Sequence, residues 1–154
     1  NGTLESTLSC IMNEKKEEDE IRQLVFCSSG AFLICRLQTH PLIVWNVNRG
    51  VVLHKNFFAN NKKDSKKKLI IHDMSSTPDD NEPFVYLLAS STADNDDSKK
   101  KKLYIHQVHV ETNKIVRKIK AGSISNDDDT SISMVCSENH VVVLNASQIK
   151  VLSL

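Results

Sequence analysis

Apolar residues cluster most densely between Pro41 and Phe58, in the run PLIVWNVNRGVVLHKNFF. Mostly β-branched and aromatic residues fill positions 42–47, the triplet Asn48-Arg49-Gly50 interrupts them, and a second such run continues to Phe58. Two runs joined by a short break that contains glycine predict a β-hairpin. The first run is apolar on both faces, which fits a strand packed between two sheets better than a strand on a solvated surface.

Similar short apolar runs, separated by turn residues, precede and follow this hairpin. Gly30 lies in the turn Ser28-Ser29-Gly30 and suits a positive φ, Gly50 breaks the hairpin, and both are expected to have structural roles, as is Trp45. No long stretch has an apolar period of 3.6 residues, so an all-β chain is predicted. The expected strands are 21–26, 31–37, 42–47, 51–58, 68–74, 84–90, 103–110, 115–121, 132–136, 140–144 and 149–154, with a further candidate at 4–12.

These strands fall into three units of the same order, at about 21–58, 68–121 and 131–154, of which the third has three strands. Polar insertions at 60–67 and 91–102 account for the greater length of the middle unit. Four-stranded units that repeat every 40 to 45 residues or so are typical of propeller blades. We therefore predict tandem four-stranded antiparallel blades of an incomplete β-propeller.

The first unit also resembles a known family. Ile43-Val44-Trp45-Asn46-Val47, followed by Gly50 and Phe57, looks like the third and fourth strands of a WD-repeat blade, and the run from Ile21 to Leu37 is similar to the two strands before them. Trp45, His106 and Leu152 would then hold the same place in their units. The resemblance implies binding of partners through the loops and rims of the propeller.

The sequence departs from the WD-repeat pattern at the dipeptide that names the family. Asn46 stands where the dipeptide has Asp, and His106-Gln107 and Leu152-Ser153 replace the dipeptide in the other two units. These departures indicate a divergent member, whose function cannot be inferred from consensus positions.

The strands make two full units and a three-stranded third unit, which is fewer than the four to eight blades that close a propeller ring. The outer faces of the first and last units would then be apolar and uncovered. We expect the propeller to be completed by other protein subunits or by the remainder of a longer chain.

Overall charge is nearly balanced, with 20 Lys and Arg against 19 Asp and Glu, but the lysines are segregated into runs. Such runs at loop ends serve either as contacts for nucleic-acid phosphates or as nuclear import signals, and the competing interpretation is a solvated insertion without a partner. No aromatic residue is interleaved with these runs, so contact with the RNA backbone rather than base stacking would be expected. The lysines concerned are Lys62, Lys63, Lys66, Lys67, Lys68, Lys99, Lys100, Lys101 and Lys102.

Other chemistry has little support in the sequence. The four cysteines show no CxxC pair, His106 and His109 would face opposite sides of a strand, and the four glycines are isolated. We expect no catalytic residues, no metal site and no cofactor. No apolar run approaches the roughly 18 residues of a membrane span, so a membrane partner is not expected either.

The function expected from these observations is a non-catalytic scaffold for protein interactions, as a propeller segment in a subunit of a multiprotein complex. The lysine runs favour an intracellular location in the nucleus or nucleolus over the cytoplasm, for example in ribosome assembly. One alternative is a module that binds the RNA backbone through its lysine-rich loops. Another is a propeller adaptor in cytoplasmic trafficking or in ubiquitin transfer.

Overall fold

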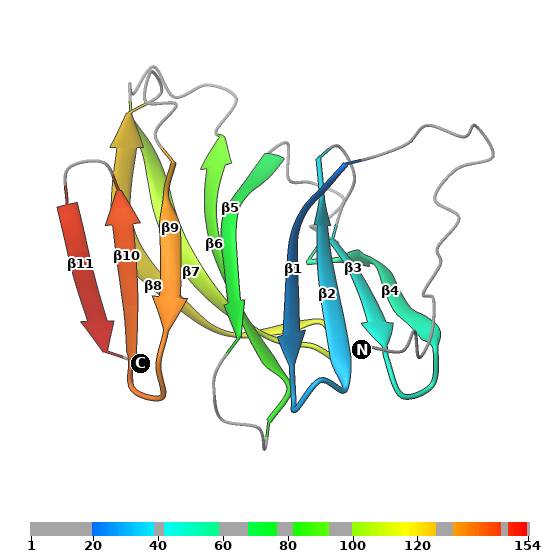
Figure 1. The fold of residues 1–154 in the computed structure, drawn as a ribbon. Coiled ribbons are helices and arrows are strands. Elements are labelled where there is room, and N and C mark those ends of the chain that lie inside the picture. The colour runs from blue at the N-terminus through cyan, green and yellow to red at the C-terminus, as the bar shows by residue number, and fades with distance from the viewer. Residues whose placement is uncertain are drawn as a thin grey trace, which may run out of the picture.

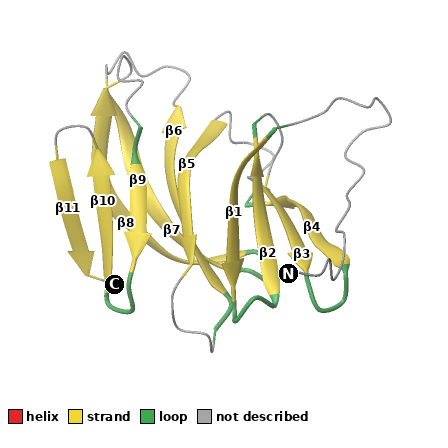
Figure 2. Ribbon diagram, viewed as in Figure 1, coloured by secondary structure: helices red, strands yellow, loops and turns green. Residues whose placement is uncertain are grey.

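The computed structural model describes residues 20–38, 42–58, 68–76, 82–92, 100–125, 131–145 and 148–153. Within these residues the secondary structure consists of eleven β-strands, and every strand expected from the sequence there is present (Figure 2). The candidate strand at 4–12 and the insertion at 60–67 lie outside the described residues. The strands are β1 (Ile21–Cys27), β2 (Phe32–Leu37), β3 (Leu42–Asn46), β4 (Val51–Phe57), β5 (Lys68–Ser76), β6 (Phe84–Thr92), β7 (Lys100–His109), β8 (Lys114–Ser125), β9 (Ser133–Cys136), β10 (His140–Asn145) and β11 (Gln148–Ser153).

Consecutive strands pair antiparallel to form three separate sheets. Sheet A has the order β1-β2-β3-β4, sheet B has the order β5-β6-β7-β8, and sheet C has the order β9-β10-β11. Tight turns make this order possible, because Gly30 (φ 84°), Gly50 (φ 63°) and Asn113 (φ 53°) adopt the left-handed conformation that reverses the chain between neighbouring strands. Gly30 and Gly50 thus lie in turns with a positive φ.

The three sheets are stacked face to face, and their first strands lie next to one another. β5 of sheet B contacts β1 of sheet A on one side and β9 of sheet C on the other, while the last strands of the sheets splay apart (Figure 1). Antiparallel four-stranded sheets that pack face to face with their first strands innermost have the arrangement of propeller blades. The chain is therefore all-β and propeller-like, with two four-stranded sheets and one three-stranded sheet, as the sequence predicted.

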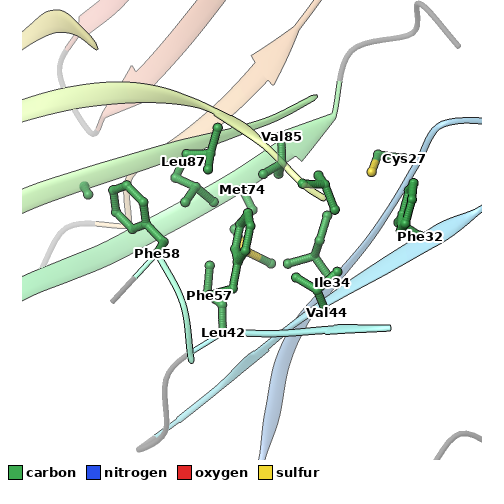
Figure 3. Packing of buried hydrophobic residues seen from close by; sticks show 13 residues of the cluster. Cys27, Phe32, Ile34, Leu42, Val44, Phe57, Phe58, Met74, Val85 and Leu87 are labelled. Carbon is green, nitrogen blue, oxygen red and sulfur yellow. The ribbon is translucent and has the colours of Figure 1, made fainter. Parts of the chain in front are cut away.

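A first apolar cluster fills the space between sheets A and B. In Figure 3 the side chains of Ile34, Val44 and Phe57 from sheet A point toward Met74 and Leu87 of sheet B. These five side chains are all at most 2% exposed. Burial of this apolar surface, at about 25 cal/mol per Å², supplies the main force that holds the two sheets together.

A second apolar cluster fills the space between sheets B and C. Because side chains alternate along a strand, β6 sends Leu87 toward sheet A and Leu88 toward sheet C, and both leucines are completely buried. Sheet C contributes Met134, Val141 and Val143 to this cluster. Sheet B is thus the middle layer, and each of its faces packs against a neighbouring sheet.

The expected bounds of the second polar insertion were too wide. The stretch 91–102 was expected to be a polar insertion, but β6 continues to Thr92 and β7 begins at Lys100. The lysines at the start of β7 pair with Ser123 to Ser125 at the end of β8, so the long β7–β8 hairpin carries them into the sheet. A polar run at the end of a strand cannot be told from a loop by its sequence alone, because pairing with the partner strand decides where the strand ends.

Candidate functional site

The described ends of the two lysine runs lie at one end of sheet B. Lys68 begins β5 and Lys100 begins β7, and β6 lies between these two strands. Neighbouring strands are about 5 Å apart, which places the two strand starts at roughly 10 Å from each other. Of the side chains that the structure describes, Lys101 is half-buried and Lys102 is exposed. Lys62, Lys63, Lys66, Lys67 and Lys99 lie outside the described residues, so the roles considered for the runs stay predictions.

A carboxylate joins the three innermost strands. Asp73 lies at a β-bulge in β5, where its Oδ1 accepts hydrogen bonds from Gln23 Nε2 of β1 at 2.6 Å and from the Met74 backbone N–H at 2.8 Å. Its Oδ2 accepts a hydrogen bond from the Met134 backbone N–H of β9 at 2.6 Å. Gln23 Nε2 also donates to the Met74 carbonyl oxygen at 2.9 Å. Asp73 therefore links sheets A, B and C through polar contacts at the point where their first strands converge.

The sequence analysis missed this residue. Asp73 interrupts the apolar run of KLIIHDM, and an acidic residue inside a strand otherwise expected to be buried is the signal that could have found it. Its partners are 50 and 61 residues away in the chain. No local pattern connects residues at that separation.

A serine and a histidine lie next to the carboxylate without forming a catalytic arrangement. His72 Nε2 lies 2.9 Å from Ser90 Oγ, but Ser90 is completely buried and the Asp73 carboxylate accepts its bonds from other groups. Arg36 donates a hydrogen bond from its guanidinium to the His72 carbonyl oxygen. Burial, together with the charges of Arg36 and Lys101, lowers the pKa of His72. This pair has the character of a packed structural contact, because a nucleophile must be reachable by its substrate.

The cysteines of the described part behave as packed side chains. Burial raises the pKa of the Cys27 thiol to about 12 and that of the Cys136 thiol to about 11. Thiols with such pKa values stay protonated at neutral pH, and the thiolate is the reactive form. In the described part of the chain no three His, Cys, Asp or Glu side chains are grouped closely enough to hold a metal ion.

His106 lies in an aromatic setting on the face of β7 toward sheet A. It is 4% exposed, and the Phe58 ring stands edge-on to it with the ring centroids 4.9 Å apart. The Tyr104 ring lies 6.3 Å away, and Lys118 Nζ lies 4.0 Å from the centroid of that ring. Burial, together with the charge of Lys118, lowers the pKa of His106 to about 4, so the imidazole is neutral at neutral pH.

This shift in pKa predicts an acid-sensitive fold. Between pH 6.5 and pH 4 the unfolded chain binds a proton at residue 106 that the folded chain does not, so the free energy of unfolding falls as the pH falls through this window. His106 accounts for about 2 to 3 kcal/mol of this fall in the free energy of unfolding. Chemical denaturation of the wild type and of His106→Gln at several pH values between 4 and 7 checks it. The variant should lose less stability across the window, and equal slopes for the two proteins would contradict the assignment.

His106 and His109 face opposite sides of β7, as expected from their spacing. His106 packs on Phe58 of sheet A, whereas His109 stands edge-on to Phe84 of β6 with the centroids 5.4 Å apart. Trp45 is 8% exposed and packs with Cys35 and Ile43 on the face of sheet A that points away from sheet B. In the described residues Trp45 is a packed side chain, and its structural role stays a prediction.

The two end faces of the stack are apolar. On sheet A, the face away from sheet B includes Leu24 and Phe26 of β1, which are 51% and 56% exposed. Sheet C presents a similar surface, which we name the outer face of sheet C. It consists of Val135, Val142, Leu144, Ile149 and Val151, which alternate with the residues that face sheet B.

Comparisons with known proteins add little to this picture. No protein-family model matches the chain, and no curated protein matches it, so membership of the WD-repeat family stays a prediction. Among solved structures, a crystal structure of Hsv2 from Kluyvelomyces marxianus, a β-propeller protein, is similar to the chain with a TM-score of 0.45 and 14% sequence identity. The match covers 88% of this chain and 36% of that structure. At this level of likeness, the fold class rests on the three sheets themselves. Across the part of the chain that the structure describes, no helix has the length and apolarity to cross a membrane.

Proposed function

We propose that the chain is a non-catalytic scaffold for protein interactions, and that the outer face of sheet C docks against the apolar face of a further antiparallel sheet. The observation that carries the proposal is the exposure of this face. Val135, Ile149 and Val151 are 59%, 72% and 63% exposed. Contiguous exposed apolar surface of this kind marks an interaction site in a folded protein.

The contact between sheets B and C supports an apolar sheet face as the partner. On the inner face of sheet C, Met134, Val141 and Val143 pack against Leu88 and Ile105 of sheet B. The outer face offers the same kind of surface, since Val151 pairs across the strands with Val142, and Ile149 pairs with Leu144. An apolar sheet face of the kind that sheet B presents would therefore fit it. Packed sheets lie about 10 Å apart, so a docked partner sheet would bury these side chains.

Self-association of the 154-residue chain tests the proposal. We expect the wild-type chain to associate as its concentration rises, because apolar end faces without their partner bind one another. Replacing Ile149 and Val151 together with lysine should reduce this association at least tenfold, because docking would bury both charges without partners. Sedimentation velocity over a range of concentrations measures the effect.

Val116→Lys is the matched control, because Val116 is 58% exposed but lies on the last strand of sheet B. It should leave association unchanged. A monomeric wild type with a sharp thermal melt at every concentration would overturn the proposal, as would an equal loss of association in the control.

A further inference from the structure

The outer hairpin of sheet B concentrates the positive charge of the described residues. β7 and β8 together carry seven Lys and Arg and no Asp or Glu, in a chain whose net charge is +1. Glu111 lies in the turn between the two strands, at the opposite end of the hairpin from Lys102. Within the described part of the chain, one ion pair is recorded, between Arg22 and Glu20, and it involves neither strand of the hairpin. The cations of this hairpin are therefore not neutralised by carboxylates of the described residues.

Strand register brings an aromatic ring among these cations. Tyr104 lies directly opposite Lys120, and His106 lies directly opposite Lys118. Residues opposite each other in adjacent strands lie on the same face of the sheet. Lys102 lies two positions before Tyr104 on β7, so it lies on that face as well. We call Lys102, Tyr104, Lys118 and Lys120 the basic-aromatic patch. The three lysines are exposed, and Tyr104 is partly exposed.

Within the patch, the Tyr104 ring contacts Lys118 and the neighbouring His106. Lys118 Nζ lies over the Tyr104 ring, 4.0 Å from its centroid, and the His106 imidazole is tilted relative to the ring with a centroid distance of 6.3 Å. His106 in turn packs against Phe58 from sheet A. The Nδ1 atom of this buried histidine has no hydrogen-bond partner among the described residues. The Tyr104 ring therefore lies beside a packed histidine, and the exposed Lys118 side chain covers one of its faces.

We propose that the basic-aromatic patch binds single-stranded nucleic acid. The Lys118 ammonium moves from the Tyr104 ring to a phosphate, Lys102 and Lys120 contact further phosphates, and a base stacks on Tyr104 in place of the Lys118 ammonium. A group of ammonium ions that has no carboxylate partner among the described residues and has an aromatic ring among its members is the composition that single strands require. An acidic peptide would use the charges alone, and the ring would contribute nothing to it. Along β7 the patch spans about 13 Å from residue 102 to residue 106, which suits a short segment of extended strand. This site is independent of the docking face on sheet C, and of the lysine runs it includes only Lys102.

Fluorescence anisotropy with a labelled oligouridylate of roughly ten nucleotides tests the proposal, because single-strand sites of this kind span several nucleotides. We expect Tyr104→Phe to bind like the wild type and Tyr104→Leu to bind about tenfold more weakly, because stacking needs an aromatic ring. The double replacement Lys118→Gln and Lys120→Gln should weaken binding. It should also reduce the slope of log K against log salt by about 1.4, since two phosphate contacts are lost.

Arg117→Gln compared with Lys118→Gln is the decisive control. Arg117 neighbours Lys118 on the same strand but points to the other face of the sheet, where it lies opposite Gln107. Arg117→Gln should therefore leave the affinity within about twofold, while Lys118→Gln lowers it. Thermal melting confirms that each variant folds.

Three results would overturn the inference. Equal losses for Arg117→Gln and Lys118→Gln would show attraction by net charge without a site. Tyr104→Leu binding like the wild type would show that no base stacks on the ring. Displacement of the oligonucleotide by polyglutamate with equal affinity would show an acidic-peptide surface instead.

Discussion

Replacing Asp73 with alanine should lower the free energy of unfolding by about 3 kcal/mol. The substitution removes the acceptor of three hydrogen bonds, two of which come from other sheets, and hydrogen bonds to charged groups contribute about 1.5 to 3 kcal/mol each before the remaining groups relax. The Met134 N–H would be left without a partner where sheets B and C meet. Urea denaturation measures the loss, and for a chain of this size we expect a melting temperature lower by roughly 10 °C.

Two further variants separate the linking role of Asp73 from its charge. Asp73→Asn keeps one acceptor oxygen but turns an amide N–H₂ toward a donor, so it should lose part of the stability and still be more stable than Asp73→Ala. Glu138→Ala removes an exposed carboxylate from the β9–β10 turn and should change stability by less than about 0.5 kcal/mol. If Asp73→Ala were as mild as Glu138→Ala, the carboxylate would not hold the three sheets together.

The strands could be predicted from the sequence because each lies between local signals that need no tertiary contact. Ser28-Ser29-Gly30 and Asn48-Arg49-Gly50 mark turns, and the runs between such turns are rich in β-branched and aromatic residues. Trp45, His106 and Leu152 do lie on the third strands of their sheets, as the repeat of the units predicted. Local chemistry therefore suffices for the order of the strands and for the count of strands in each sheet.

Functional residues could not be predicted in this way, because they are defined by pairing across strands. Along the chain no aromatic residue is interleaved with the lysine runs, so the sequence favoured contact with the RNA backbone over base stacking. In the sheet, Tyr104 lies opposite Lys120, a residue 16 positions later that belonged to no recognised run. The basic-aromatic patch exists only once the register of β7 and β8 is known. Asp73 is a similar case, since its role depends on strands that come together from distant parts of the chain.

Among the described residues, sheets A and C pack on sheet B through two separate apolar clusters, so the two interfaces of sheet B should respond separately to damage. Leu87 and Leu88 are adjacent in β6 and completely buried, but Leu87 belongs to the cluster with sheet A and Leu88 to the cluster with sheet C. Each leucine-to-alanine substitution should cost about 3 kcal/mol, from lost burial and from the cavity left behind. Hydrogen exchange should show where the loss falls. Leu87→Ala should raise exchange mainly in β1 to β4, and Leu88→Ala mainly in β9 to β11, because a stack of repeated units is stabilised by nearest-neighbour interfaces.

Leu53→Ala provides the baseline, since Leu53 is 37% exposed on β4 and its loss should cost less than about 1 kcal/mol. If Leu87→Ala and Leu88→Ala raised exchange equally in all three sheets, the chain would unfold as one cooperative body and the interfaces would not be separable. Separate responses would instead mean that each sheet face is an independent docking surface. The face of sheet C that points away from sheet B could then accept another sheet without altering the contact between sheets A and B.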